Sequence, residues 1–446
     1  MAKNTPAGLR NLVLYSIYVR NHGSNGTFAD VENDLERIRS MGVDVIWFMP
    51  IHPIGEIDRK GSQGSPYSIK DYRAVNPEYG SKDDFRRLID KAHQLGLRVM
   101  IDVVFNHTAH DSVLVAKHPN WYHQDATGKP ITTVPAWSDV IDLRHPNPQL
   151  TKYLAKTLAD WAKFGVDGFR CDVASLVPVE VWREIRRTVE KVKPQVIWLA
   201  ESVHAEFIEQ RIENDLFAVP DCELYRAFDI TYDYDIFPVW QHAVIGKQPV
   251  SRYLDMLRFQ NCIYPANFIK MRYVENHDQI RIMKLAPSRD QALAWTAFQA
   301  FNKGAFLLYG GQESAATHTP SLFELDKVQW GSYELQKFIT SLAVLKKDPA
   351  QVHGRFAILN NDAPIEAVWY YPPASLYGIF NVNGASGKIP VNLPNGSYTN
   401  LLTGTTLRVS AGTMTAPKFA AIVRYNPVTV PSAYRVEMLR DPNHQE

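Results

Sequence analysis

The chain has 446 residues, of which 45% are hydrophobic and 21% are charged. Such a composition can bury a large core and excludes a disordered or fibrous protein. The 48 Lys and Arg residues nearly balance the 47 Asp and Glu residues, which leaves a net charge of +1. Because no basic excess is present to hold a phosphate backbone, we expect no nucleic-acid partner.

The cysteines and the N-terminal segment bear on the compartment. Three cysteines, Cys171, Cys222 and Cys262, cannot form a disulfide framework, and we predict that they are buried small hydrophobic residues. The apolar run near the N-terminus is short, is broken by Arg20 and lacks a small-residue cleavage pattern. We therefore expect a cytoplasmic protein with no membrane partner; a secreted protein that has lost its signal peptide is the alternative.

Apolar runs alternate with amphipathic stretches through the first three quarters of the chain. Eight runs, mostly rich in β-branched and aromatic residues, predict buried strands at residues 11–18, 43–50, 97–105, 167–174, 196–202, 228–233, 269–276 and 305–311. Helical patterns lie between most of them, at residues 30–42, 81–96, 147–165, 177–194 and 288–304. The first is expected to follow an Asp cap at Asp30, and Ser81 is the expected cap of the second. This alternation predicts an α/β fold, a (β/α)8 TIM barrel. An open doubly wound sheet is the alternative, but no Gly-rich phosphate loop follows the first strand.

Two features divide the chain into predicted domains. Residues 108–146, rich in His, Pro, Asp and Trp, are too many for a structureless loop and predict a small insertion between strand 3 and helix 3. The catalytic barrel would then comprise residues 1–107 and 147–347. Residues 348–446 contain short strands separated by Gly, Pro and Asn turns, which predict a C-terminal antiparallel β-sandwich with a polar tail.

Four segments place polar residues at the carboxyl ends of predicted strands, where a barrel displays its catalytic groups: residues 102–107, 168–175, 200–202 and 275–278. Within the second segment, strand alternation puts Arg170 and Asp172 on one face and Cys171 on the other. Arg170 beside Asp172 would keep that carboxylate ionised. A single acid within an apolar strand would be interpreted as part of a structural ion pair. Because four such polar segments lie at the same end of the predicted strands, we interpret them as a catalytic cluster.

The spacing of the acids predicts a reaction type. Asp172 and Glu201 are separated by about one βα unit, which places them on adjacent parallel strands roughly 4.8 Å apart. Two carboxyl groups about 5–5.5 Å apart suit retaining glycoside hydrolysis through a covalent intermediate. A third acid, Asp278, follows a later strand. A site with three acids is expected to keep one of them protonated, and Glu201, the least paired in sequence, is the expected proton donor.

Taken in order, the motifs DVVFNH, GFRCDVAS, AES and ENHD resemble four short regions of the α-amylase superfamily, family 13 of the glycoside hydrolases. The stretch GSPYSIKDYRAVNPEYGSKDDFRRLIDKAH is also similar to that family, and the resemblance covers nearly the whole chain. It is nearest to an intracellular-type α-amylase or maltodextrin hydrolase. The resemblance implies that Asp172 is the nucleophile, Glu201 the general acid/base and Asp278 the acid that binds sugar hydroxyls and favours a distorted ring.

The resemblance also implies substrate-binding residues. Arg170 matches the residue that orients the nucleophile, and His107 and His277 match histidines that hydrogen-bond the bound glucose. Tyr67 aligns with an aromatic platform under that sugar, with ordinary loop packing as the alternative, and Asp102 resembles a supporting carboxylate. If Tyr67 acts by stacking alone, its hydroxyl is not needed.

No cofactor is expected to be required. Asn106 matches a residue that often ligates calcium in the family, and Asp142 is a second weak candidate from the insertion. Two oxygen donors fall short of the 6–8 that calcium takes. The Lys-His pair that many α-amylases carry after the nucleophile is also missing, since Ser175 and Leu176 fill that stretch. A structural calcium ion is therefore possible but not favoured.

The sequence thus predicts a retaining hydrolase of α-1,4-glucosidic bonds in starch, maltodextrins or related α-glucans. A transglycosylase, such as a glucanotransferase, would use the same residues and differ only in how an acceptor sugar competes with water. A non-catalytic family relative that binds sugar or a transporter is the third reading, which the retained acids Asp172, Glu201 and Asp278 argue against.

Overall fold

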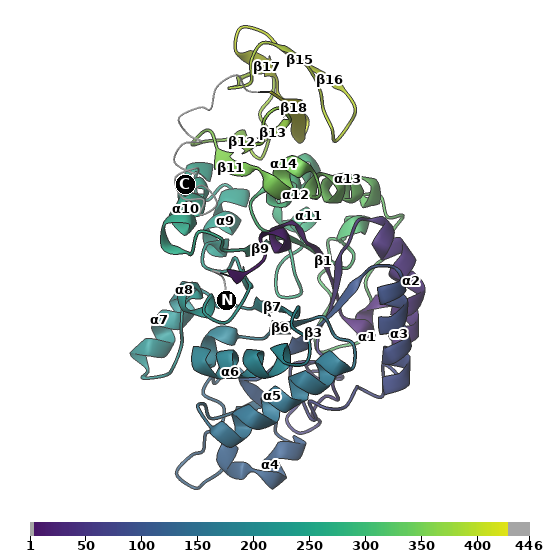
Figure 1. Ribbon diagram of the computed structural model, residues 1–446, viewed down its shortest axis with the longest axis vertical. Coiled ribbons are helices and arrows are strands. Elements are labelled where there is room, and N and C mark those ends of the chain that lie inside the picture. The colour runs from purple at the N-terminus through teal and green to yellow at the C-terminus, as the bar shows by residue number, and fades with distance from the viewer. Residues whose placement is uncertain (1–3, 427–446) are drawn as a thin grey trace. The chain divides into compact units, whose positions relative to one another are not determined.

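The structure, a computed structural model, describes residues 4–426. Eight parallel strands form a closed barrel in the order β1-β10-β9-β8-β7-β6-β3-β2. Of these strands, Figure 1 labels β1, β3, β6, β7 and β9. The eight strands are β1 (Val13–Ile17), β2 (Val45–Phe48), β3 (Arg98–Val103), β6 (Gly168–Cys171), β7 (Ile197–Ala200), β8 (Ile230–Tyr232), β9 (Lys270–Arg272) and β10 (Ala305–Tyr309). Each lies within one of the eight predicted segments. The predicted TIM barrel is confirmed, and the open doubly wound sheet is wrong.

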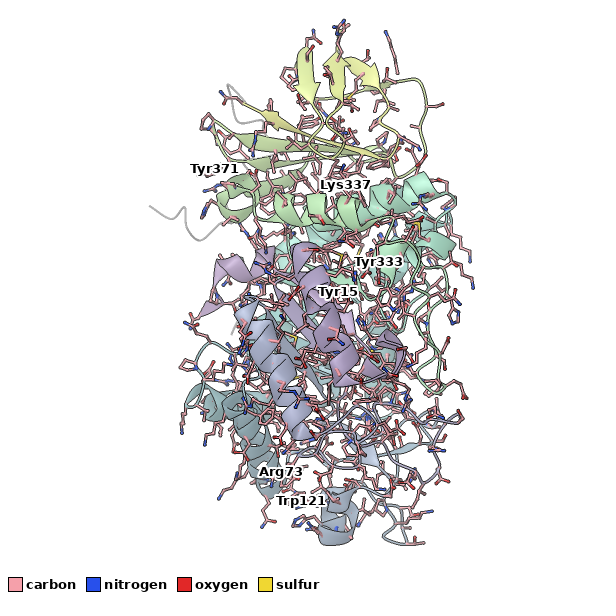
Figure 2. All side chains as sticks on the ribbon, turned by 90° about the vertical axis from the view of Figure 1, so that its right-hand side faces the viewer. Tyr15, Arg73, Trp121, Tyr333, Lys337 and Tyr371 are labelled. Atoms are coloured by element: carbon pink, nitrogen blue, oxygen red, sulfur yellow. The ribbon has the colours of Figure 1, made fainter. Side chains whose placement is uncertain are left out.

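Nearly every residue of these strands is buried, as expected for a parallel sheet whose two faces are both covered. Side chains occupy the space between the ribbons, and Tyr15 of β1 is fully buried (Figure 2). The barrel is thus a packed core whose strand ends, and not a central channel, are available for chemistry.

All five predicted helices are present: α2 (Phe28–Ser40), α3 (Lys82–Gln94), α5 (Pro148–Lys163), α6 (Val179–Glu190) and α12 (Arg289–Phe301). Ser81 caps α3 as predicted, since its side chain accepts a hydrogen bond from the Asp84 backbone N–H. The predicted Asp cap of α2 is wrong. Thr27 is the cap, and Asp30 is its partner three residues into the helix, where the two residues form a reciprocal capping box.

Further helices lie in stretches for which the sequence predicted no element. They are α1 (Val19–His22), α4 (Val113–Lys117), α7 (Ala205–Glu213), α8 (Asp221–Leu224), α9 (Phe237–Val244), α10 (Val250–Ile263), α11 (Ile282–Leu285), α13 (Gln336–Lys346) and α14 (Pro349–His353).

The chain forms two compact units. Among the described residues, the first comprises Leu14–Asp235 and Thr319–Gln329, and the second comprises residues 4–13, Ile236–His318 and residues 330–426. In the first unit, the segment between β3 and α5 contains β4 (His107–Ala109), α4 and β5 (Val140–Asp142). β4 and β5 pair antiparallel, with His107 opposite Asp142. The domain limits drawn from the sequence stay a prediction.

The second unit contains the predicted C-terminal antiparallel sheet, in the order β11 (Arg355–Ile358), β12 (Ile365–Tyr370), β13 (Ser375–Phe380) and β18 (Ala420–Tyr425). Two two-stranded antiparallel sheets pack against it: β14 (Lys388–Pro390) with β17 (Thr413–Thr415), and β15 (Gly396–Thr399) with β16 (Thr406–Val409). Val368, Ile389 and Val409 share one buried core across the three sheets. The polar tail predicted for this region begins beyond residue 426 and lies outside the described residues.

The cysteines differ from expectation in part. Cys171 is buried, as predicted, but Cys222 and Cys262 are exposed because they lie on α8 and near the end of α10. All three are free thiols. Within residues 4–426, no helix has both the length and the apolar composition needed to cross a bilayer.

Candidate active site

The register of two neighbouring strands sets the first two acids side by side. β6 and β7 pair in parallel with Cys171 opposite Ala200, so the next residues, Asp172 and Glu201, leave the two strands at the same level. The ladder continues through them, since the Glu201 N–H donates to the Cys171 carbonyl over 2.9 Å and the Asp172 N–H donates to the Val103 carbonyl over 2.9 Å. Both acids therefore stand on backbone that the barrel holds in place.

Arg170 joins three carboxylates at this point. Its Nη1 lies 2.8 Å from Asp102 Oδ1 and 2.7 Å from Asp172 Oδ1, and its Nη2 lies 2.9 Å from Glu201 Oε1. The contact with Glu201 is an ion pair at close range without the alignment of a hydrogen bond. Burial alone would lower the pKa of the Arg170 guanidinium, but the charges of Asp102 and Glu201 raise it well above its usual value. Arg170 therefore stays charged, with Nη1 toward Asp102 and Asp172 and Nη2 toward Glu201.

Three aromatic residues hold the orientation of this guanidinium. The rings of Trp47, Tyr67 and Tyr232 lie 5.2, 5.7 and 5.3 Å from its central carbon. Arg170 Nε donates to the Tyr232 hydroxyl over 3.1 Å, while Trp47 Nε1 and the Tyr67 hydroxyl each donate to Asp102 Oδ2 over 3.3 Å. The network fixes Arg170 and Asp102 as one unit. The Tyr67 hydroxyl thus has a partner that the resemblance did not imply.

Trp47 and Tyr232 are functional candidates that the sequence reasoning missed. Both lie toward the carboxyl ends of predicted strands, β2 and β8, where the four polar motifs drew attention to charged residues alone. An aromatic residue in such a strand has no sequence signal that separates it from ordinary core, because its role depends on facing Arg170.

The backbone after Asp172 is strained. Val173 has φ 35° and ψ 47°, the left-handed region that a β-branched residue rarely occupies. In this conformation its N–H donates to Glu201 Oε2 over 2.8 Å. Glu201 is thereby held from two sides, by Arg170 at one oxygen and by the Val173 backbone at the other, and a strained turn at such a point is typical of a functional site.

His107 lies on β4 and is 5% exposed. Burial lowers the pKa of its imidazole, against the smaller opposing effects of Asp142 and Asp139. Its Nδ1 lies 3.2 Å from Asn106 Nδ2, which donates to it. The structure therefore presents His107 as a neutral ring that can accept or donate a hydrogen bond without carrying charge.

An apolar wall adjoins the acids, and the sequence reasoning did not foresee it. Trp137, from the segment between β3 and α5, lies 5.5 Å from the His107 ring and 6.1 Å from Phe207 of α7. Trp137 and Phe207 pack on a cluster formed by Val173, Leu176 and Val203. We call Trp137 and Phe207 the aromatic wall. Val173 and Val203, on which the aromatic wall packs, follow Asp172 and Glu201 closely in the chain.

The two calcium candidates lie close together and both make hydrogen bonds, although Asp142 Oδ1 is buried without a hydrogen-bond partner within residues 4–426. The Asn106 amide donates to His107, and Asp142 Oδ2 accepts hydrogen bonds from the backbone N–H and the hydroxyl of Thr133. Arg211, itself 7% exposed, donates to the Thr133 hydroxyl over 3.0 Å, and Asp142 is the charge that acts on it. This set of groups holds one buried carboxylate and a neighbouring cation, which fits Ca²⁺ poorly. Across residues 4–426 no group of three or more His, Cys, Asp or Glu is arranged to hold a metal ion. Whether the protein binds a structural calcium ion stays a prediction.

The remaining site candidates belong to the second unit. His277 Nε2 lies 3.0 Å from Asp278 Oδ2, and the Asp278 N–H donates to Asn276 Oδ1 over 2.9 Å. Arg281 anchors this loop, because it contacts Glu275 at 2.6 Å and donates to the Gly310 carbonyl over 2.8 Å. Burial raises the pKa of Glu275 even beside Arg281. Asp278, in contrast, exposes 38% of its side chain.

A closed barrel with two acids at adjacent strand ends fits an enzyme that works through paired carboxylates. The family described as alpha amylase, catalytic domain, matches residues 15–129 and 135–354, and the bacterial alpha-amylase C-terminal domain matches residues 361–423. The chain belongs to the alpha-amylase family.

Two solved structures are similar over most of the chain. An alpha-amylase from Lactobacillus plantarum is 40% identical, with a TM-score of 0.90 over 94% of this chain and 100% of the other. A noncanonic maltogenic alpha-amylase from Thermotoga neapolitana is 31% identical, with a TM-score of 0.83 and the same coverage.

Curated relatives match a smaller share of the chain and carry several names. An alpha-1,4-glucan:maltose-1-phosphate maltosyltransferase from Rhodospirillum rubrum is 36% identical over 40% of this chain and 29% of its own length. Alpha-amylase MalA from Haloarcula japonica is 27% identical over 77% of this chain and 50% of its own length. The chain thus spans half or less of these two relatives.

Proposed function

We propose that this protein is a retaining glycoside hydrolase that cleaves α-1,4-glucosidic bonds of maltodextrins, starch or related α-glucans. The observation that carries the proposal is the placement of Asp172 and Glu201 on adjacent strand ends, on two edges of one buried guanidinium. Two acids on neighbouring parallel strands suit the short carboxyl separation of the retaining mechanism, and inverting enzymes need a wider gap.

Asp172 is the nucleophile. The 2.7 Å hydrogen bond from Arg170 Nη1 to Asp172 Oδ1 favours the ionised carboxylate and fixes its plane. Attack on the anomeric carbon forms a bond from that carbon to the carboxylate oxygen while the bond to the departing glycosidic oxygen breaks.

Glu201 is the general acid and then the general base. Its proton passes to the glycosidic oxygen as the leaving sugar departs, and the ionised Glu201 then takes a proton from the water that releases the first sugar. The Val173 N–H at 2.8 Å fixes Oε2, and Arg170 lies beside Oε1, so the carboxyl keeps one orientation through both steps. Arg170 also stabilises the charge that remains on Glu201 after the proton leaves.

The other residues bind the sugar. Asp278 and His277 are assigned to sugar hydroxyls through the family resemblance, and their mutual contact at 3.0 Å supports a joint role. His107, neutral in its buried position, is suited to bind a hydroxyl, and Tyr67 is assigned to the face of the same sugar. No cofactor takes part in this mechanism.

Transfer to a second sugar is the alternative, and two observations favour keeping it in view. Relatives named as maltosyltransferases and as a cyclomaltodextrinase are among the matches. The aromatic wall also offers an apolar surface near the acids, on which an acceptor sugar could compete with water. We assign the enzyme to hydrolysis, since the same wall could hold the leaving part of a glucan and so does not by itself call for an acceptor sugar. A cytoplasmic location would favour imported maltodextrins over granular starch.

Time-resolved product analysis tests both parts of the proposal. Maltoheptaose should yield only shorter products by chromatography, and proton NMR of the first turnovers should show the α-anomer. Products longer than maltoheptaose would assign the enzyme to transfer. A first product in the β-anomer would refute the retaining mechanism and the nucleophilic role of Asp172 with it.

A further inference from the structure

A buried arginine lies just past the first barrel strand. Arg20 belongs to α1, the short helix after β1, and only 4% of its surface is exposed. Burial of a charged group is unfavourable unless close partners offset it, and an apolar residue of similar volume often stabilises a fold at least as well. The partners of Arg20 therefore indicate what its charge is used for.

The Arg20 guanidinium holds the turn that precedes Tyr67. Its Nη1 donates to the Gly64 carbonyl over 3.2 Å, and its Nη2 donates to the Gln63 carbonyl over 3.0 Å. Gly64 has φ 73°, and an added Cβ there would lie 2.8 Å from Ile54 Cγ2, so the turn is tightly packed as well as hydrogen-bonded. A planar guanidinium with two donors suits this double contact, because one terminal group reaches two successive carbonyls.

The other neighbours of Arg20 contribute less directional contact. Its Nη2 lies 3.5 Å from Glu78 Oε2, but 59% of the Glu78 side chain is exposed, so water screens this ion pair. The Tyr18 ring lies 5.5 Å from the guanidinium carbon, a distance at which cation–π attraction acts. The two carbonyls of the turn are thus the close hydrogen-bonding partners that fix the direction of this buried charge.

Tyr67 lies between two anchors. On its C-terminal side the backbone pairs with an earlier segment, since the Gly55 N–H donates to the Ser68 carbonyl over 2.9 Å. Its own N–H donates to Ser65 Oγ over 3.2 Å. On its N-terminal side the anchor is Arg20, which therefore controls the half of the turn that backbone pairing does not hold.

A contact with a distant segment keeps this turn from depending on Arg20 alone. The Gln63 N–H donates to the Phe323 carbonyl over 2.9 Å, and the Ser62 N–H donates to Glu324 Oε1 over 3.1 Å. Replacement of Arg20 should therefore loosen the turn without releasing it, which makes the residue open to mutation.

We propose that Arg20 is a positioning residue for Tyr67. By holding the turn before it, Arg20 keeps the Tyr67 hydroxyl 3.3 Å from Asp102 Oδ2 and the ring 5.7 Å from the Arg170 guanidinium carbon. The inference rests on the sugar-binding role proposed for Tyr67. A shift of that ring would move the sugar away from the geometry in which its anomeric carbon meets the nucleophile, and the rate would fall.

A double-mutant cycle on kcat/KM with maltoheptaose tests the proposal. Arg20→Met should lower kcat/KM by about fivefold or more in the wild-type background, because it removes both donors to the turn. In the Tyr67→Ala background the same change should cost little, since the residue that Arg20 positions is already gone. An equal loss in both backgrounds, or no loss in either, would overturn the proposal.

Two further variants secure the comparison. Arg20→Lys keeps the buried charge, so it is expected to fold even if Arg20→Met does not, and the same cycle applies to it because one ammonium group cannot reproduce the planar two-donor contact. Arg186→Met is the matched control. Arg186 is also largely buried and donates to a backbone carbonyl, that of Ala227 over 2.8 Å, but this contact lies just before β8 begins, away from the strand ends that carry the acids. Its loss should lower the melting temperature and show no coupling to Tyr67.

Hydrogen exchange read by mass spectrometry tests the positioning without any sugar. Peptides that cover residues 61–67 should exchange faster in Arg20→Met and Arg20→Lys than in the wild type, and Arg186→Met should leave them unchanged. Unchanged exchange in both Arg20 variants would overturn the role of Arg20 alone. Wild-type protein that leaves maltoheptaose intact would instead contradict the proposed function, while the exchange data would still decide whether Arg20 holds the turn.

Discussion

At the scale of single residues, Arg170 controls the geometry of the site. It is fully buried and contacts Asp102, Asp172 and Glu201 through two terminal nitrogens. The acids around this buried guanidinium keep it charged. The aromatic rings of Trp47 and Tyr232 fix its plane. Asp172 and Glu201 therefore owe their relative orientation to one shared partner.

The first prediction concerns those acids. Asp172→Asn and Glu201→Gln should each lower kcat by about a thousandfold or more while KM changes little, because each removes a group that acts on the transition state. Steady-state kinetics on maltoheptaose measures this, with circular dichroism to confirm folding. Glu213→Gln, an exposed acid at the end of α7, is the control and should behave as wild type. A variant of either acid that keeps more than about a tenth of wild-type kcat would disprove the role assigned to it.

The second prediction concerns Tyr67. Tyr67→Ala should lower kcat/KM by about tenfold or more, since it removes both the surface under the sugar and the hydrogen bond to Asp102. Tyr67→Phe should lose about 1 kcal/mol, or about fivefold, because the hydroxyl 3.3 Å from Asp102 Oδ2 is absent while the ring remains.

The pair of Tyr67 variants separates two roles. A Phe variant equal to wild type would show that the ring alone matters, as stacking by itself would require. A Phe variant as damaged as the Ala variant would assign the whole effect to the Asp102 hydrogen bond. Unchanged kinetics in the Ala variant would place Tyr67 outside the sugar site.

At the scale of elements, the segment between β3 and α5 is held to α7 by a chain of hydrogen bonds through Thr133. Asp142 on β5 binds Thr133, and Arg211 of α7 donates to the same Thr133 hydroxyl. Arg211 thus brings a positive charge near Asp142, with the Thr133 hydroxyl between them. The aromatic wall joins the same two elements through Trp137 and Phe207.

The third prediction follows from that network. Thermal melts in EDTA and in added calcium should coincide, because Arg211 already lies where a stabilising cation would act on Asp142. Arg211→Met should lower the melting temperature in both conditions, since it leaves a buried carboxylate without its neighbouring cation. The matched control is Arg183→Met on the outside of α6. A melting temperature several degrees lower in EDTA than in calcium would reveal a stabilising metal site and refute this account.

At the scale of the whole molecule, buried histidines couple stability to pH. Burial lowers the pKa of His52 and of His145 to about 4, and it lowers the pKa of His107 as well. A histidine whose pKa is lower in the folded state than in the unfolded state binds its proton more readily after unfolding. Its contribution to stability is therefore full above the unfolded value of 6.5 and is lost as pH falls toward the folded value.

The fourth prediction is the resulting acid sensitivity. The free energy of unfolding, measured by urea titration, should fall as pH is lowered from about 7 to about 5. His145→Gln should flatten this dependence, because it removes one group that protonates on unfolding. The exposed His353→Gln should leave the slope unchanged. A free energy of unfolding that rises toward pH 5 would contradict the direction of these pKa shifts.

The sequence by itself determined the barrel, the pairing of Asp172 with Glu201 and the family, because each depends on local pattern. Period-two alternation sets the face of Arg170 and Asp172, and one βα unit of spacing sets neighbouring strands. Local pattern did not predict the cap of α2. Thr27 and Asp30 accept hydrogen bonds from each other's backbone N–H groups, and either residue type could have been the cap. Only the tertiary structure decided that Trp47 and Tyr232 enclose Arg170 and that the Tyr67 hydroxyl donates to Asp102. It also decided that Arg211 lies near Asp142. Likewise, only the tertiary structure brought Arg20 against the carbonyls of Gln63 and Gly64. These contacts join residues that are far apart in the chain. Many apolar or charged residues of suitable size would continue the same local pattern, so the sequence pattern does not show which side chains meet. The packing of the folded chain decides this.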